Sequence, residues 1–125
     1  MSAIIFHRDG GLETLLELDG NVLEQENGFW IKVEVRAVAA SAHIPHGIRY
    51  SLTLHDRYGT RVLGYDNAHA VKLPKKFKFA GRRLPHDHRH RGASDTGVPY
   101  LFESPQRLLE DFFAEVDLVI REASK

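Results

Sequence analysis

Apolar and polar residues alternate in two segments in the first half of the chain. From Phe29 to Val38, apolar side chains stand at every second position, and most of the residues between them are polar or charged. The same alternation recurs in residues 48–55, and residues 60–66 follow the turn 56–59 as the returning strand of a hairpin. A period of two is typical of strands that bury one face. We therefore predict three strands, the last two joined as a hairpin, with a bulge or a close backbone approach at Gly64.

The residues before these strands have a less specific pattern. The segment from Leu12 to Leu18 fits a helix or a strand by periodicity, and the turn dipeptide Asp19-Gly20 follows it. Because the next segments are all strands, we predict an edge strand here. Residues 22–28 are expected to form a short, irregular strand or a connection that the Asn27-Gly28 turn closes.

The C-terminal segment has the period of a helix. Ser104 is a favoured helix cap, and Pro105 is favoured at the first helical position. Apolar residues then follow at steps of three and four, as on the buried face of a helix. These residues are Leu108, Leu109, Phe112, Phe113, Val116, Val119 and Ile120. We predict a single α+β domain over residues 1–125, an antiparallel β-meander of about four strands with one long C-terminal helix packed on one face.

Composition narrows the class of protein but not its activity. A hydrophobic fraction of 42% and a charged fraction of 27% are ordinary for a globular domain. There is no cysteine, which excludes disulfides and thiolate chemistry. No apolar run is long enough to span a bilayer, and the N-terminal sequence lacks the features of a signal peptide. We expect a cytoplasmic protein without a membrane partner.

Charge is distributed unevenly along the chain. The formal net charge is zero, yet the segment from Lys72 to Arg91 holds eight Lys or Arg residues and one acid, Asp87. Such a segment favours a local anionic partner, and a solvated surface loop is the alternative interpretation.

Three alternating histidines, His86, His88 and His90, end this basic segment. In an extended backbone they would project to one side. Imidazoles at this spacing are suited to a zinc or nickel site, to proton transfer, or simply to a solvated polar strand. The neighbouring arginines, Arg89 and Arg91, disfavour a metal ion because they raise the local positive potential.

A further hypothesis joins the histidines to the end of the predicted strand 60–66. Cleavage of an RNA phosphodiester needs a base for the ribose 2′-hydroxyl, cations for the phosphate and an acid for the leaving oxygen. His88 or His86 would transfer protons, and Asp66 would orient the histidine or pair with it. Aromatic side chains would stack on a splayed base; the candidates are Phe77, Phe79 and Tyr100. No Walker, dinucleotide-binding or nucleophile-elbow motif is present to suggest another chemistry.

At these residues the chain resembles the TumE-type toxin family of prokaryotic toxin–antitoxin systems. The resemblance rests on Tyr50-Ser51-Leu52, on Tyr65-Asp66-Asn67-Ala68-His69, on His86-Asp87-His88-Arg89-His90, and on Tyr100-Leu101-Phe102 before the C-terminal helix. It covers about residues 12 to 122. The basic linker from Val71 to Arg83 is longer than the family pattern.

The resemblance implies a toxin, with a helix-turn-helix antitoxin as partner and RNA cleavage as the activity. The implied catalytic residues are Tyr65, Asp66, Asn67, His69, His86, His88 and His90. Together with the charge pattern, it gives an RNA-binding set of Lys75, Lys76, Lys78, Arg82, Arg83, Arg89 and Arg91. We expect a metal-independent reaction without a cofactor. A histidine-rich metal-binding protein and a non-catalytic module that binds nucleic acid or protein through the loop 72–91 stay open as alternatives, as does assembly into a homo-oligomer.

Overall fold

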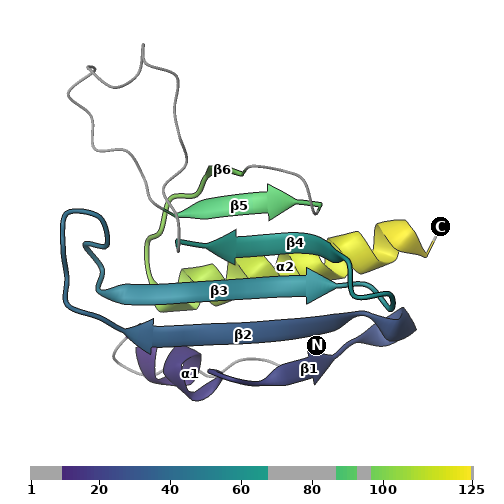
Figure 1. Cartoon of the computed structure of the whole chain (residues 1–125), viewed down its shortest axis with the longest axis horizontal. Coiled ribbons are helices and arrows are strands. Elements are labelled where there is room, and N and C mark those ends of the chain that lie inside the picture. The colour runs from purple at the N-terminus through teal and green to yellow at the C-terminus, as the bar shows by residue number, and fades with distance from the viewer. Residues whose placement is uncertain (1–9, 68–86, 93–96, 125) are drawn as a thin grey trace, which may run out of the picture.

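The computed structural model describes residues 10–67, 87–92 and 97–124, and it contains one antiparallel sheet. Its strands are β1 (Val22–Glu24), β2 (Trp30–Ala37), β3 (Ile48–His55), β4 (Arg61–Asp66), β5 (His88–Arg91) and β6 (Val98–Pro99). Each strand pairs with its neighbours in sequence, so the six strands lie in the order β1-β2-β3-β4-β5-β6 (Figure 1). The predicted meander is confirmed, with two more strands than the predicted four.

In the described residues two α-helices accompany the sheet, and the first corrects a prediction. Residues Leu12–Glu17 form helix α1, not an edge strand. Leu12, Leu15 and Leu16 have the i, i+3, i+4 spacing of one helix face, and Leu15 is fully buried. After β1, the predicted Asn-Gly turn is part of the short 3₁₀ helix η1 (Glu26–Gly28). Its last two residues, Asn27 and Gly28, both have positive φ.

The long helix α2 (Pro105–Ala123) begins as predicted. The Ser104 side chain caps the helix by accepting a hydrogen bond from the Arg107 backbone N–H, and Pro105 occupies its first turn. Figure 1 shows α2 running behind the sheet. Its apolar face supplies Leu108, Phe112 and Val116 to a core shared with the strands. No helix in the described ranges is long and apolar enough to cross a membrane.

The register of the strands gives the sheet two different faces. One face is apolar: Ile31, Val33, Leu52 and Leu54 pack there against α2 and against Leu15 of α1. The opposite face, called the open face below, is mainly polar. It carries Lys32, Glu34, Arg36, Arg49, Ser51, Thr53, Asp66, His88 and His90.

Gly64 lies on the open face but is not where the sheet is irregular. The register between β3 and β4 shifts at Leu54 and His55, opposite Val62. A Cβ atom at Gly64 would meet Thr53 at an ordinary contact distance of 3.6 Å. The predicted bulge or close approach at Gly64 is therefore wrong, and the bulge lies two residues earlier.

Candidate functional site

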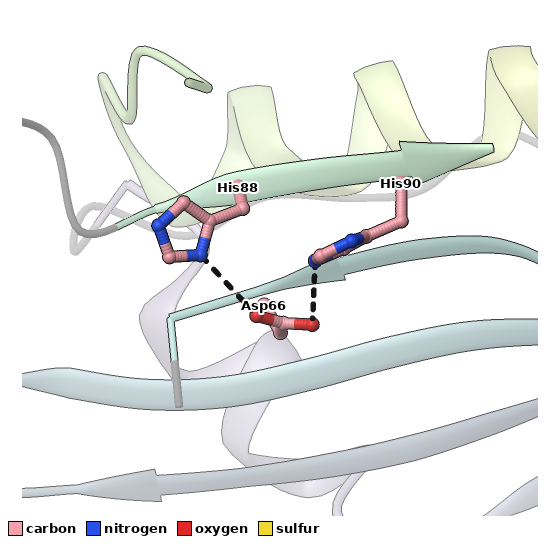
Figure 2. Close-up of side chains that lie close together, drawn as sticks. All are labelled: Asp66, His88 and His90. Atoms are coloured by element: carbon pink, nitrogen blue, oxygen red, sulfur yellow. Dashed lines mark ion pairs between the residues drawn. The ribbon is translucent and has the colours of Figure 1, made fainter. Parts of the chain in front are cut away.

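Asp66 lies between the side chains of two histidines on the open face. Asp66 is the last residue of β4 and the register partner of His88 on β5, and His90 follows two residues later on the same face. The Oδ1 atom of Asp66 is 3.6 Å from His88 Nδ1, and its Oδ2 atom is 3.2 Å from His90 Nε2 (Figure 2). One carboxylate thus contacts two imidazoles, and we call these three residues the Asp66 cluster.

The three side chains differ in their exposure to solvent. Asp66 is 16% exposed and His90 11%, whereas His88 is only 2% exposed. Burial lowers the pKa of His88 below its ordinary value, and this effect exceeds the opposing attraction of Asp66. His88 is therefore neutral at pH 7. Asp66 is the most exposed of the three; the His90 side chain is partly exposed, but its Nε2 atom is buried.

Gly97 lies close to the ring of His90. Its φ of +100° is in the region that favours glycine, and a Cβ atom placed there would lie 2.6 Å from His90 Cε1. Any larger residue at this position would displace the ring. The sequence shows a glycine here but cannot show what it contacts.

The Asp66 cluster has the donor set of a metal site. One ligand atom from each of its three residues can be chosen so that all lie within 4.8 Å of one another. Two imidazole nitrogens and a carboxylate oxygen are common ligands of zinc and of other divalent transition metals. The candidate set therefore contains Asp66, whereas the sequence suggested His86.

Arg89 and Arg91 lie on the other face of β5, against helix α2. Glu115 accepts hydrogen bonds from Arg89 Nε and Nη2, both at 2.7 Å, and from Arg91 Nη1 at 3.3 Å. Tyr65 also donates to Glu115, at 2.6 Å. Two predicted RNA-binding residues and one predicted catalytic residue thus surround one carboxylate, away from the Asp66 cluster. That they act on RNA stays a prediction.

The electrostatics of this second group are those of a structural ion pair. Burial raises the pKa of Glu115, but the hydrogen bonds from Arg89 and Tyr65 and the charges of Arg89 and Arg91 outweigh burial, so the pKa lies below its ordinary value. Burial and the bond to Glu115 raise the pKa of the Tyr65 hydroxyl, which stays protonated and donates. No sequence pattern pairs Glu115 with these residues.

Asn67 and Tyr100 also have protein partners. The Asn67 side chain donates to the Ile48 carbonyl at 2.7 Å and accepts from the Tyr50 backbone N–H at 3.0 Å, which extends the pairing of β3 and β4. Tyr100 donates to Asp111 at 2.6 Å and packs edge-on against Tyr65, on the α2 side of the sheet.

A buried group around Asp87 fixes the start of β5, and sequence reasoning missed it. Asp87 Oδ2 accepts from the Tyr50 hydroxyl at 2.7 Å and lies 2.9 Å from His46 Nε2. His46 Nδ1 accepts from the Ile48 backbone N–H, so its ring proton is on Nε2 and points to Asp87. The available signal was Tyr50, a polar tip on an otherwise apolar strand face, which requires a buried partner.

Several predicted site residues lie outside the described part of the chain. They are His69, Lys75, Lys76, Phe77, Lys78, Phe79, Arg82, Arg83 and His86. Their assignments as catalytic, RNA-binding or stacking residues stay predictions.

Comparison with known proteins gives one match. A family model described as Toxin TumE matches residues 26–120, from η1 to the end of the buried face of α2. No curated protein and no solved structure matches the chain. The matched region is well over half of the sequence and contains every member of the Asp66 cluster. The chain therefore belongs to the TumE toxin family, as its strand-end and histidine motifs indicated.

Proposed function

We propose that the protein is a toxin that cleaves RNA at the Asp66 cluster without a metal ion. The observation that supports this most is the position of Asp66, whose two carboxylate oxygens each face a different imidazole at 3.6 and 3.2 Å. A carboxylate and an imidazole in contact are a proton acceptor and a proton donor held together, as cleavage through the 2′-hydroxyl requires.

Exposure decides which groups would meet the substrate. Because His88 is almost fully enclosed, we assign substrate contact to Asp66 and His90, and we assign to His88 the task of orienting Asp66. This differs from the sequence-based hypothesis, in which His88 or His86 transferred the proton and Asp66 oriented it.

The reaction then proceeds by two proton transfers. The Asp66 carboxylate accepts the proton of a ribose 2′-hydroxyl, the 2′-oxygen attacks phosphorus, and protonated His90 gives its proton to the departing 5′-oxygen. The products are a 2′,3′-cyclic phosphate and a 5′-hydroxyl. Proton exchange with solvent then restores the starting protonation of both.

A toxin of this kind needs a partner that neutralises it. Membership of a toxin family implies a cognate antitoxin, and we propose that it is of the helix-turn-helix class and that both proteins act in the cytoplasm. A short helix-turn-helix gene beside the toxin gene would support this partner class. A neighbouring gene of another type would count against it.

The test compares near-isosteric variants on one sheet face. Asp66→Asn and His90→Gln should each relieve growth arrest and lower RNA cleavage by about 10²–10⁴-fold, with thermal unfolding close to the wild type. The matched control is His55→Gln. His55 is a histidine of the same sheet face, on β3, but it contacts Trp30 and Thr53. Full toxicity of Asp66→Asn or His90→Gln would refute the proposal.

A metal-binding function is the second candidate, and one observation favours it. In the sequence, the charges of Arg89 and Arg91 were an argument against a metal ion. In the structure both side chains project to the opposite face of the sheet, where Glu115 binds them. This candidate predicts stoichiometric zinc or nickel in tag-free protein, lost in Asp66→Asn, and cleavage that a chelator abolishes. Metal-free protein that cleaves RNA in the presence of the chelator excludes it.

A further inference from the structure

Two arginines stand directly opposite each other on the open face, close to the Asp66 cluster. In the pairing of β2 with β3, Arg36 is the partner of Arg49 and Glu34 is the partner of Ser51. Ser51 is in turn the partner of Asp66 on β4. Directly opposed residues have Cβ atoms about 4.5–5.5 Å apart on the same face. The arginine pair therefore lies beside the row that contains Ser51 and Asp66.

The acids beside this pair contact other groups in the described part of the chain. Like charges directly opposite each other destabilise a sheet, and among the described residues no ion pair involves the exposed Arg36. Glu34 is 3.0 Å from the ammonium group of Lys32, and Asp19 accepts a hydrogen bond from the Val35 backbone N–H at 2.8 Å. Both neighbouring acids thus have other partners.

The arginines also line a hollow in the surface. Its volume is about 390 Å³, and its lining includes Arg36, Arg49 and Ser51 together with Glu34 and Asp19. A guanidinium group binds a phosphate through two parallel hydrogen bonds, and a serine hydroxyl can donate a third. Two arginines and a serine on one wall are a suitable donor set for an anion that carries phosphate.

We propose that Arg36, Arg49 and Ser51 form the phosphate-binding subsite for the RNA that the Asp66 cluster cleaves. This inference rests on the proposed function for its ligand, since it takes the cluster as the point of cleavage. Adjacent strands are about 4.8 Å apart, and alternate residues of a strand are about 7 Å apart. Arg49 and Ser51 lie one strand away from Asp66 and Arg36 lies two strands away, so the subsite would hold a phosphate next to the one that is cleaved.

The subsite takes over a role that the sequence assigned to Arg89 and Arg91. Those two residues are bound to Glu115 on the other face, whereas Arg36 and Arg49 share the face of Asp66. Nothing in the sequence distinguished the latter pair, because ten residues, 38–47, separate their strands in the chain and only the register brings them together.

The test measures binding without cleavage. The probe is a short, fluorescent 2′-O-methyl oligoribonucleotide, which lacks the attacking hydroxyl, titrated at several salt concentrations. The double variant Arg36→Gln/Arg49→Gln should weaken binding at least about tenfold. It should also reduce the slope of log affinity against log salt by about 1.4, since each phosphate contact to a single strand contributes about 0.7. Ser51→Ala should weaken binding without changing the slope.

The control removes the same charge elsewhere. Arg57→Gln/Arg121→Gln changes two arginines far from the arginine pair in the fold, one in the β3–β4 turn and one in the last turn of α2. Equal losses in the two double variants, or no binding of the probe to the wild type, would overturn the subsite.

The outcome is separable from that of the proposed function. If the wild type binds the probe through Arg36 and Arg49 but cleaves no RNA, the subsite stands and the catalytic proposal fails. If cleavage depends on Asp66 and His90 while the arginine variants bind and cleave normally, the catalytic proposal stands and the subsite is overturned.

Discussion

Consecutive residues of β5 serve opposite faces of the sheet. His88 and His90 face Asp66, whereas Arg89 and Arg91 face Glu115. Side chains alternate along a strand, so a substitution at one of these positions alters one face only. Chemistry and stability can therefore be tested separately on a strand of four residues.

Glu115→Gln should destabilise the fold in a way that depends on pH. At pH 7 the variant keeps the shape of Glu115 but loses the charged acceptor of two arginines, at a cost of about 1–3 kcal/mol in the free energy of unfolding. The folded-state pKa of Glu115 is below its ordinary value of 4.5. Its contribution is therefore fully present above pH 4.5 and is lost as the pH falls further.

Urea unfolding at pH 7 and near pH 3.5 checks this. The difference between wild type and variant should be large at pH 7 and smaller at the acidic pH. A difference that stays constant with pH would show that the charge of Glu115 is not what stabilises the fold.

Gly97→Ala should impair the site without removing any functional group. A Cβ atom at Gly97 would displace the His90 ring, in addition to the strain of a positive φ, which costs about 1–2 kcal/mol. Gly92→Ala is the matched control, because Gly92 also has a positive φ, of +85°, but has no atom within 4 Å of its would-be Cβ. Growth arrest should weaken in the first variant and persist in the second, and equal loss in both would show that only backbone strain matters.

At the level of single residues, the sequence predicts part of the site. Asp66 ends a predicted strand and His88 and His90 alternate, so their presence in one site could be proposed. The partners of Glu115 and Asp87 could not, because each pair joins elements that are distant in sequence. Periodicity shows which face a residue takes but not what lies opposite it in the fold.

The position of strand β5 depends on the contacts of its first residues. Asp87 precedes the strand and is bound by Tyr50 of β3 and by His46 of the connection before β3. Burial and the neighbouring Asp87 raise the pKa of the Tyr50 hydroxyl, which therefore stays protonated and donates. These contacts set where His88 meets Asp66.

Tyr50→Phe should destabilise the protein by about 1–3 kcal/mol, because it leaves a buried carboxylate with one donor fewer. Tyr58→Phe is the control, since Tyr58 is 84% exposed and should show no change. Chemical denaturation midpoints measure both. Equal midpoints for the two variants would mean that the Tyr50 hydroxyl does not hold the start of β5.

Most elements were predictable, and the exceptions have physical reasons. Strands β2 and β3 and helix α2 have the period of their structure, and β4 follows β3 through a turn that the sequence shows. The helix α1 has only six residues, too few for its leucines to distinguish a helix from a strand. The sequence His-Arg-His-Arg of β5 contains no apolar residue, so the pattern of apolar positions does not indicate that one of its faces is buried. The two residues of β6 form no pattern at all.

At the scale of the whole molecule, the two faces of the sheet differ in composition. The apolar face and the helices supply the core, and the open face carries the Asp66 cluster and the arginine pair. A net charge of zero makes bulk attraction to RNA weak, so the proposed RNA binding depends on local cations. Substitutions on the open face should therefore affect activity more than stability, and those on the apolar face the reverse.

The most direct test of the central claim, that Asp66 and His90 cleave RNA, is the chemistry of the cut ends. Purified protein is incubated with RNA in the presence of a chelator, and the termini of the fragments are identified. We predict 2′,3′-cyclic phosphate and 5′-hydroxyl ends from the wild type, and a loss of about 10²–10⁴-fold in their rate of formation in Asp66→Asn and His90→Gln. No cleavage by the wild type, 5′-phosphate ends, or undiminished cleavage by either variant would contradict the claim.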